Sequence, residues 1–185
     1  MADFIADTFR RAMDADIGLV NGGSVRADMI IRPGVLTKRD VLSMLPFNNR
    51  VVKLVITGAV IRAALENGVS TAAEELQPGR FAQVSGIRYA FDAGRPPGRR
   101  ITSITIDRKP LDEGRTYTLA TTTYLAVEAG DGYDMFRGAT FLVRPEQGPI
   151  ESDLLLKAIA SVPVIAPKTD GRIKRVDAKD KNSCN

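Results

Sequence analysis

The chain of 185 residues has no histidine and only one cysteine, Cys184. Zinc sites in proteins draw chiefly on His and Cys, and many acid–base mechanisms use His to carry the proton. A carboxylate or Mg²⁺ site would not need histidine, but no clustered Asp/Glu motif stands out. A single cysteine also excludes a disulfide framework within one chain. The residues therefore predict no metal site in this chain.

Long apolar runs are missing as well, because none approaches the roughly 20 residues that span a bilayer. The first residues, Met1-Ala2-Asp3, open directly into an amphipathic pattern, without the basic and apolar regions of a signal peptide. We therefore expect no membrane span and no export signal in this chain. It is expected to be either a cytoplasmic protein or a piece of a longer one.

A continuous basic surface is not predicted either, although the net charge is +4. The basic residues are scattered, with local clusters only at 95–100 and 168–181. The first cluster contains a Pro-Pro-Gly turn, and the second alternates Lys or Arg with Asp, as a solvated terminus does. No stripe of aromatic residues accompanies them, so we do not expect a nucleic-acid groove.

The composition of the whole chain, 44% apolar and 26% charged, is that of an ordinary globular protein. We predict one mixed α/β domain over residues 1–185, with no internal repeat or linker. Periodicity and caps predict helices over 3–14, from Thr37 to Pro46, from Thr57 to near Gly68, and from Ser152 onward. Apolar and β-branched runs predict strands at 17–20, 51–56, 81–91, 101–106 and 117–121, with a turn at 32–34, a loop at 69–80 and a hairpin-type connection at 107–114.

The sequence NGGSVR, residues 21–26, follows the first predicted strand. Gly22 and Gly23 predict a tight turn at which the backbone can approach a ligand closely. Asn21 and Arg26 bracket this turn with an amide and a guanidinium, both suited to polar recognition. Taken alone, a strand–turn–strand corner with a solvated arginine explains the segment better, so its interpretation depends on other segments.

The sequence LPFNN, residues 45–49, places an aromatic residue directly after the helix-ending Pro46. The turn is expected to expose Phe47, which could then stack on a planar ring, while Asn49 could read the edge of that ring. The alternative is a plain loop in which Phe47 is a core residue, as most Phe residues are.

The sequence TTTYLAVEAGDGY, residues 121–133, supplies a second aromatic residue, Tyr124, and an Asp131 flanked by Gly130 and Gly132. Gly-Asp-Gly is common in simple turns, but its carboxylate is also placed to accept the two hydroxyls of a ribose. Together the three segments supply two aromatic faces, an amide, a carboxylate and an arginine. Such a set of side chains suits the binding of a nucleoside.

These three motifs, in this order, resemble the C-terminal domain of the 5'-nucleotidase family. That family includes bacterial periplasmic UDP-sugar hydrolase/5'-nucleotidases and the vertebrate ecto-5'-nucleotidase. The similarity extends to the opening ADFIADTFRRAMDADIGLVNGG, to FAQVSGIRYAFD, which resembles a strand pair of the family, and to DGRIKR near the end, and so covers nearly the whole chain. It implies the mixed α/β fold of that domain.

The resemblance assigns roles to the matching residues. Phe47 and Tyr124 would stack on the base, Asp131 would bind the ribose hydroxyls, and Arg26 would be a substrate arginine. Asn21 and Asn49 would contact the base or its surroundings, and the backbone would be shaped by Gly22, Gly23, Gly130 and Gly132. Tyr124 stands where the family usually has Phe, and the segment from Tyr124 to Asp131 is one residue longer than usual, with Ala129 before Gly130.

In this family the chemistry belongs to an N-terminal metallophosphatase domain, which is absent from this chain. The resemblance implies that two divalent metal ions bind there, that this chain holds no cofactor and no catalytic residue, and that its ligand is a nucleotide or nucleoside, adenine nucleotides being plausible. It places the full-length protein in the periplasm or outside the cell. Two alternatives remain: a free-standing, non-enzymatic nucleotide-binding module, and the same domain in a relative that hydrolyses a non-nucleotide substrate, as the thiosulfohydrolase-like proteins of sulfur oxidation do.

Overall fold

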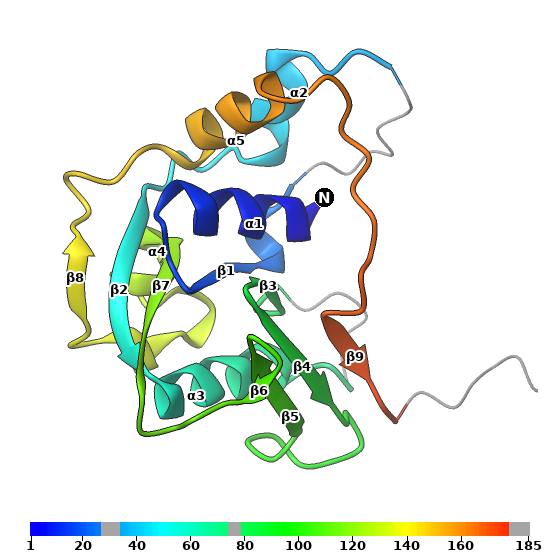
Figure 1. Cartoon of the computed structure of the whole chain (residues 1–185), viewed down its shortest axis with the longest axis vertical. Helices are drawn as coiled ribbons and strands as arrows, with labels where there is room; N and C mark the ends of the chain where they lie inside the picture. Colours follow the sequence, from blue (N-terminus) through cyan, green and yellow to red (C-terminus); the bar gives the residue numbers. More distant parts are fainter. Residues whose placement is uncertain (27–33, 74–78, 178–185) are drawn as a thin grey trace, which may run out of the picture.

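The computed structural model describes residues 1–26, 34–73 and 79–177, and these residues form a mixed α/β fold (Figure 1). Its helices are α1 (Ala2–Ala12), α2 (Lys38–Met44), α3 (Gly58–Val69), α4 (Thr123–Ala126) and α5 (Glu151–Ala160), with short 3₁₀ turns η1 (Gly22–Ser24), η2 (Gly130–Gly132) and η3 (Asp134–Phe136). Its strands are β1 (Ile17–Asn21), β2 (Val51–Thr57), β3 (Ala82–Ser85), β4 (Ile87–Phe91), β5 (Ile101–Ile106), β6 (Lys109–Pro110), β7 (Thr116–Thr122), β8 (Thr140–Val143) and β9 (Ile173–Arg175). The fold class expected from the sequence is confirmed.

The strands form two sheets among the described residues. The five-stranded sheet has the order β3-β1-β7-β2-β8, and only β1 and β7 are parallel in it. The four-stranded sheet has the order β6-β5-β4-β9, with β9 parallel to β4. Both sheets therefore mix parallel and antiparallel pairs.

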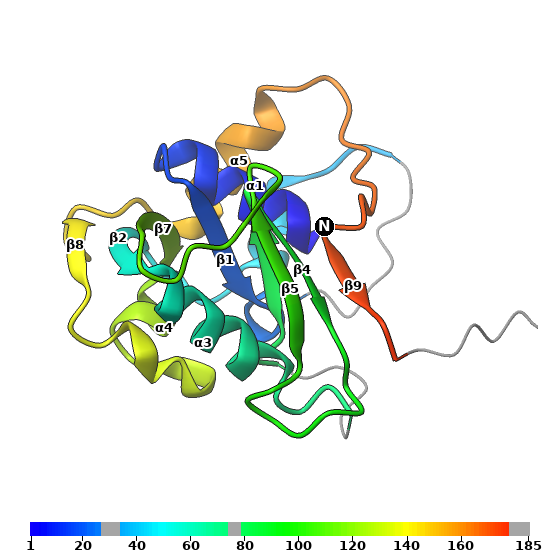
Figure 2. The same ribbon diagram turned by 60° about the horizontal axis from the view of Figure 1, so that its bottom comes forward.

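The five-stranded sheet is a central layer with an apolar core on each face. Successive side chains of a strand point to opposite faces. Accordingly, Leu19 and Leu119 belong to one apolar cluster, whereas Val20 and Ala120 belong to the other. Helices α1, α2 and α5 cover the second face (Figure 1), and α3 with the four-stranded sheet covers the first, α3 lying between β2 and β5 (Figure 2).

Local capping chemistry explains where two of these helices begin. The Thr37 side chain accepts a hydrogen bond from the Asp40 backbone, and the Asp40 side chain accepts one from the Thr37 backbone, which is a capping box at the start of α2. Thr57 caps α3 in a similar way. Within α2, Val41 is buried whereas Leu42 is 40% exposed, because only one side of this short helix meets the core.

The segment 81–91, for which the apolar pattern predicts strand and the resemblance implies a strand pair, forms two strands, β3 and β4, which lie in different sheets. Gly86 separates β3 from β4 with φ +76°, a left-handed conformation that favours glycine. A Cβ atom at this position would also overlap the backbone oxygen of Asp16. The chain therefore bends at Gly86 and passes from the central sheet to the four-stranded sheet.

Several short elements have no counterpart in the predictions. The sequence pattern did not indicate α4, β8 or β9, and the connection 107–114 contains the short strand β6. Its tight turn is made by Asp107 and Arg108, which have φ 50° and 65°.

The turn predicted at 32–34 and Cys184 lie wholly or partly outside the described residues, as does part of the predicted loop 69–80. The extent of one domain to residue 185 stays a prediction.

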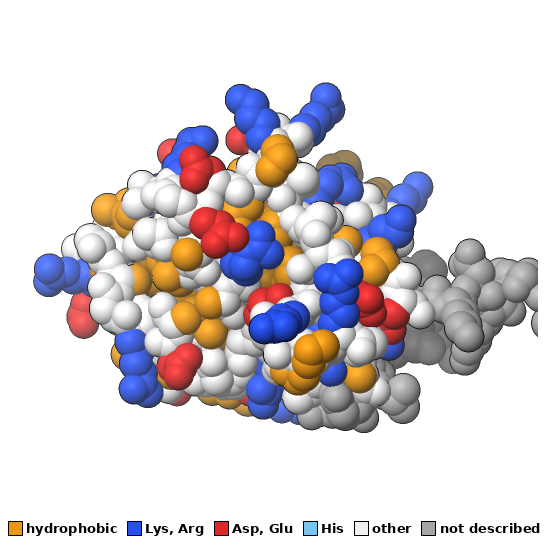
Figure 3. Space-filling model, turned by 90° about the horizontal axis from the view of Figure 1, so that it is seen from below, with side chains coloured by type: hydrophobic (Ala, Val, Ile, Leu, Met, Phe, Trp, Pro, Cys, Tyr) orange, Lys and Arg blue, Asp and Glu red, His pale blue; other side chains and the backbone are white. Residues whose placement is uncertain are grey.

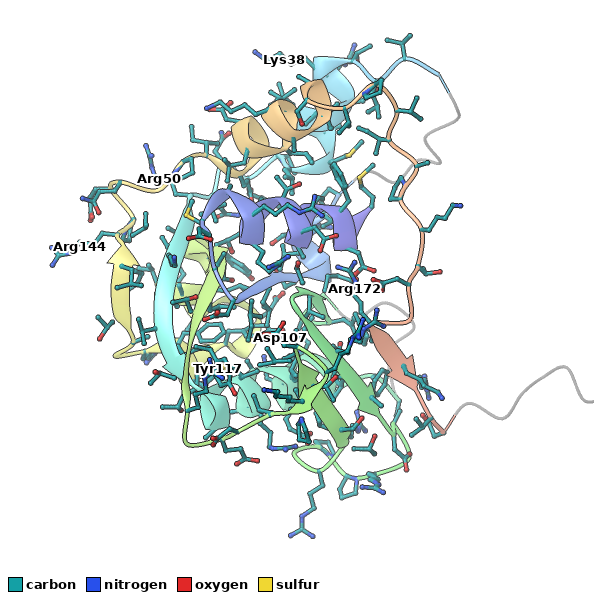
Figure 4. The ribbon with its side chains drawn as sticks, viewed as in Figure 1. Lys38, Arg50, Asp107, Tyr117, Arg144 and Arg172 are labelled. Atoms are coloured by element: carbon teal, nitrogen blue, oxygen red, sulfur yellow. The ribbon has the colours of Figure 1, made fainter. Side chains whose placement is uncertain are left out.

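A cluster of charged side chains ties β9 to the first helix, and we call it the Arg172 cluster: Arg172 with Asp3, Asp7 and Asp170. Arg172, labelled in Figure 4, lies where β9 approaches α1. Its guanidinium donates to Asp7 at 2.7 Å, to Asp170 at 3.0 Å and to the Val84 carbonyl at 2.9 Å, and it is 3.7 Å from Asp3. The Arg172 side chain is only 15% exposed. Arg172, in the motif DGRIKR, therefore links the start of β9 to helix α1.

The face of the molecule seen in Figure 3 carries Lys and Arg side chains interspersed with Asp and Glu. No continuous basic stripe is visible on that face among the residues drawn in colour. Within the described part of the chain, none of the helices combines the length and apolar character needed to cross a bilayer.

Candidate functional site

Sheet topology brings the three motif segments to one edge of the central sheet. Because β1 and β7 run parallel, their carboxyl ends, followed by residues 21–26 and 123–133, lie at the same edge. Because β2 runs antiparallel to β7, its start lies there too, with Val51 opposite Thr122. Residues 45–50 precede that start. Segments separated by about 100 residues thus meet at one place.

A fourth segment, residues 79–81, reaches this edge through β3, which pairs antiparallel with β1. The amides of Gly22 and Gly23 donate to the carbonyls of Phe81 and Gly79 at 2.8 and 2.7 Å. A Cβ atom on Gly23 would lie 3.2 Å from the Gly79 backbone, which is a very tight contact. The Gly-Gly turn therefore permits a close approach of two backbones.

Backbone hydrogen bonds also join the other segments. The Arg26 amide donates to the Met44 carbonyl at 2.8 Å, which links the first segment to the end of α2. The Thr123 amide donates to the Arg50 carbonyl at 2.8 Å, and the Arg50 amide donates to the Thr123 hydroxyl at 3.2 Å. The Arg50 side chain, labelled in Figure 4, turns toward the chain before α5 and donates to the Gly148 carbonyl at 2.7 Å. Main-chain contacts therefore fix the relative positions of the segments.

The joined segments enclose a cavity of about 430 Å³, which we call the pocket. This is within the size range of small-molecule sites. Seven of the ten residues to which the resemblance assigns roles line the pocket: Asn21, Gly23, Arg26, Phe47, Asn49, Tyr124 and Asp131. Gly22, Gly130 and Gly132 lie next to lining residues without lining it themselves.

Sequence reasoning missed three lining residues: Ser24, Gly79 and Glu128. Ser24 and Glu128 belong to the motifs at 21–26 and 121–133, and their polar side chains could have indicated that they line the site. The Ser24 hydroxyl donates to the Asn21 amide oxygen. Gly79 had no signal of its own, because it reaches the pocket only through the pairing of β3 with β1.

Asp131 is held in the pocket by neutral groups. The Asn21 amide nitrogen donates to Asp131 Oδ2 at 2.5 Å, and the Tyr124 hydroxyl donates to Oδ1 at 3.1 Å. The Asn67 amide donates to the Asp131 backbone carbonyl at 3.1 Å. No Lys or Arg of the described residues forms an ion pair with this carboxylate, so its charge is not neutralised within the described structure.

The segment from Tyr124 to Asp131 contains left-handed backbone. Ala129 and Asp131 have φ 54° and 52°, and Gly132 has φ 80°. This turn brings Asp131 back to the Tyr124 hydroxyl. The two side chains therefore lie side by side.

Tyr124 offers one ring face to the pocket. A Cβ atom on Gly130 would overlap the Tyr124 ring, so the glycine lets the backbone lie against the ring and covers it there. Burial and the hydrogen bond to the neighbouring Asp131 carboxylate raise the pKa of Tyr124. Its hydroxyl therefore stays protonated at neutral pH and acts as a donor.

Phe47 is 51% exposed, so the alternative that it is a core residue is wrong. It follows Pro46 at the end of α2, and Asn48 after it has φ 55°, a left-handed conformation that Asn tolerates. The Arg26 guanidinium carbon lies 5.6 Å from the centre of the Phe47 ring, in a cation–π contact. A planar ligand could stack on the other face of Phe47, or on the same face after Arg26 moves.

Asn49 is tied to Glu151, the first residue of α5. Glu151 Oε1 accepts hydrogen bonds from both the backbone nitrogen and the side-chain nitrogen of Asn49, each at 3.2 Å. The Glu151 side chain is 0% exposed. Burial raises its pKa to about 7, against the hydrogen bonds from Asn49, which act to lower it.

The described residues contain no group of three or more His, Cys, Asp or Glu side chains that could hold a metal ion. The pocket offers flat apolar surfaces, an unneutralised carboxylate, an amide and a guanidinium. This arrangement can bind a ligand that has a planar ring and hydroxyl groups.

Comparisons with known proteins agree on one family. The family model for "5'-nucleotidase, C-terminal domain" matches residues 1–138. The chain is 32% identical over 186 aligned residues to the trifunctional nucleotide phosphoesterase protein YfkN of Bacillus subtilis, an alignment covering 95% of this chain and 12% of that protein. It is 29% identical over 170 residues to a 5'-nucleotidase of Diplobatis ommata, covering 87% of this chain and 29% of that protein.

Among solved structures, a 5'-nucleotidase precursor from Thermus thermophilus is similar with a TM-score of 0.86 and 32% identity. The match covers 96% of this chain and 35% of that one. The chain therefore spans about a third or less of the length of these three relatives.

Proposed function

The chain belongs to the family of 5'-nucleotidase C-terminal domains, and on that premise we propose that its pocket binds the nucleoside part of a nucleotide. The observation that carries this proposal is that Phe47, Asn49, Tyr124 and Asp131 line one cavity, although they come from two distant segments. The bound base stacks on the aromatic rings, and the phosphate end extends toward a separate catalytic domain.

The aromatic rings supply affinity without demanding a particular base. Every nucleobase has a flat π-face, and stacking on an aromatic side chain contributes about 1–3 kcal/mol per base. Phe47 is the better platform, because half of its surface is exposed and it has no hydrogen bond to maintain. Tyr124 contributes the ring face that Gly130 leaves open.

Asp131 supplies the contact to the ribose. Its two carboxylate oxygens each accept one hydrogen bond from a neutral donor, Asn21 or Tyr124, and a carboxylate has room for further bonds. Two neighbouring ribose hydroxyls can donate to these oxygens. Hydrogen bonds to a charged acceptor are stronger than neutral ones.

Arg26 supplies positive charge at the edge of the pocket. In the free chain its guanidinium rests on the Phe47 ring, which keeps it close to the site without an ion-pair partner among the described residues. A phosphate offers a stronger partner than an aromatic ring, because guanidinium and phosphate oxygens form charged hydrogen bonds. The arginine is therefore released toward the phosphate when a nucleotide binds.

We assign the hydrolysis of the phosphate ester to the rest of the full-length protein. Its catalytic domain is an N-terminal metallophosphatase with two divalent metal ions, for which the described residues of this chain offer no ligand cluster. The full-length protein is then a phosphoric monoester hydrolase of the 5'-nucleotidase type, in the periplasm or outside the cell. This chain serves as its substrate-recognition domain.

Calorimetric titration of the 185-residue chain with adenosine tests the proposal. We expect measurable binding, which Phe47→Ala weakens roughly 5- to 150-fold through the loss of a stacking ring. Asp131→Ala should weaken it as well, through loss of the ribose contact. Leu142→Ala is the matched control, because Leu142 is similarly exposed, at 52%, but lies on β8 and does not line the pocket.

Two results would contradict the proposal. Absence of adenosine binding by the folded chain would refute nucleoside recognition, and unchanged binding in both pocket variants would refute the assigned site. A parallel assay of AMP hydrolysis with added Zn²⁺ or Mn²⁺ should show no turnover. Substantial metal-dependent turnover by this chain would show that the catalytic residues are not confined to another domain.

A further inference from the structure

Glu151 is a buried acid whose bonding partners point to a role in the pocket. Its side chain is fully buried, and Oε1 accepts two hydrogen bonds, both from Asn49. The Glu151 amide in turn donates to the Asn49 carbonyl at 2.9 Å. Glu151 does not line the pocket, whereas Asn49 does. Glu151 therefore acts on the pocket only through Asn49.

A purely structural role explains this carboxylate poorly. No Lys or Arg of the described residues forms an ion pair with it, and its second oxygen, Oε2, is buried without a hydrogen-bond partner among them. Burying an acid in this way is costly, and a well-packed apolar side chain at such a position is often equally or more stabilising. Its place in the first turn of α5 favours a negative charge, but this helix effect does not require a bond to the Asn49 side chain.

The chemistry of the two groups fixes the direction of the Asn49 amide. An asparagine by itself can present either its carbonyl oxygen or its NH₂ group to a ligand. An ionised carboxylate only accepts hydrogen bonds, so the Asn49 NH₂ group must face Glu151. The atom left without a partner among the described residues is then Asn49 Oδ1, an acceptor.

We propose that Glu151 is a positioning residue that holds Asn49 with its carbonyl oxygen available to the pocket, so that the site selects a base whose edge donates a hydrogen bond. The proposal rests on the nucleoside-binding function proposed above and adds the chemistry of the base. The ligand it fits is a purine with an exocyclic amino group, such as 6-aminopurine. A base that lacks this donor leaves Asn49 Oδ1 unpaired when it excludes water.

The test compares adenosine with purine riboside, which lacks only the 6-amino group, by calorimetric titration at pH 8.5, where the carboxylate is ionised. We expect the wild-type chain to bind adenosine about 5- to 10-fold more tightly, which lies within the range of roughly 2- to 13-fold for one neutral hydrogen bond. Glu151→Leu should reduce this preference to about 2-fold or less, because the Asn49 amide is then free to rotate.

Glu151→Gln is the conservative variant that should restore the preference. The Gln oxygen must still accept the Asn49 backbone N–H, which fixes the Gln amide and keeps an acceptor in front of the Asn49 NH₂ group. A residue that served only packing would give the same selectivity in the Leu and Gln variants. Asn49→Leu should also lose the preference, and it provides the comparison if Glu151→Leu does not fold.

The outcomes separate this inference from the proposed function. Equal binding of the two ligands by the wild-type chain, or a full preference in Glu151→Leu or Asn49→Leu, would overturn the positioning role while leaving nucleoside binding intact. If the folded wild-type chain binds neither ligand, the proposed function fails and this inference fails with it.

Discussion

Two polar clusters of this protein, the Arg172 cluster and the pocket, use the same residue types in opposite ways. In the Arg172 cluster a guanidinium lies among three carboxylates and donates to two of them. In the pocket the Asp131 carboxylate receives only neutral donors, and the nearby guanidinium of Arg26 rests on an aromatic ring. Charges are paired with each other in one place and kept apart in the other.

The pKa values of three acids reflect this difference. Burial acts to raise the pKa of Asp7, but hydrogen bonds from Arg172 hold it below its ordinary value, and they lower the pKa of Asp170 as well. Beside the pocket, burial raises the pKa of Glu151 to about 7, because no cation opposes it. Asp3 departs from this division, because burial raises its pKa although Arg172 acts to lower it. Removing the cation of a paired cluster leaves its carboxylates uncompensated, which is costly.

The largest effect is expected from breaking the paired cluster. Arg172→Leu leaves three carboxylates close together without their cation, and we expect the free energy of unfolding to fall by about 3–5 kcal/mol. Urea denaturation measures this change, and adenosine affinity of the folded variant should stay within about 2-fold of wild type. Arg172→Lys keeps the charge without the planar fork and should cost less. A loss below about 1 kcal/mol for Arg172→Leu would show that the cluster is not a stabilising element.

Glu151 should respond to pH in the opposite direction to Asp7 and Asp170 of the Arg172 cluster. Glu151 has a folded-state pKa of about 7 against an ordinary value of 4.5, so the folded protein binds more protons between these pH values. Its contribution is therefore fully present below pH 4.5 and is lost as the pH rises through 7, by up to about 3 kcal/mol. Asp7 and Asp170, with lowered pKa values, contribute stability that is lost as the pH falls through their folded-state pKa values.

Glu151→Gln isolates this pH dependence, because glutamine does not titrate. Urea unfolding at pH 4.5, 6 and 7.5 should show wild type losing stability relative to the variant as the pH rises. A difference between the two proteins that does not change with pH would mean that Glu151 is not a buried, uncompensated acid.

The smallest effect is expected from Tyr124→Phe, which removes one neutral donor from Asp131 and keeps the ring. The fold should lose about 1 kcal/mol or less in urea unfolding, because the hydrogen bond is only partly buried. Adenosine affinity by calorimetry should stay within about 3-fold, since stacking is retained. A loss of 10-fold or more would show that the hydroxyl contacts the ligand directly.

The sequence predicted those parts of the fold that depend on neighbouring residues. Capping residues and apolar periodicity located α1, α2, α3 and α5, because caps and helix faces involve residues three or four positions apart. Its apolar pattern alone did not divide 81–91 into two strands, whereas the resemblance implied a strand pair; the need for glycine at position 86 comes from the backbone of Asp16, 70 residues earlier in the chain. The sequence pattern also missed β9, whose ladder is made with the distant strand β4.

The site divides in the same way. Three motifs predicted its residues by their chemistry, and seven of the ten residues with predicted roles line the pocket. Two features of the site could not be predicted. Gly79 reaches the pocket through the pairing of β3 with β1, and the hydrogen bond from Asn49 to Glu151 depends on the packing of α5.

By itself, then, the sequence determined which chemical groups this protein can offer: aromatic rings, amides, a carboxylate and an arginine, with no histidine and no metal cluster in its motifs. The tertiary structure decided which of them meet and in what state. The parallel pairing of β1 with β7 and the antiparallel pairing of β2 with β7 bring distant segments to one edge. Burial then decides which acid has a raised pKa, as Glu151 has. Desolvation depends on the whole fold and not on neighbours in sequence.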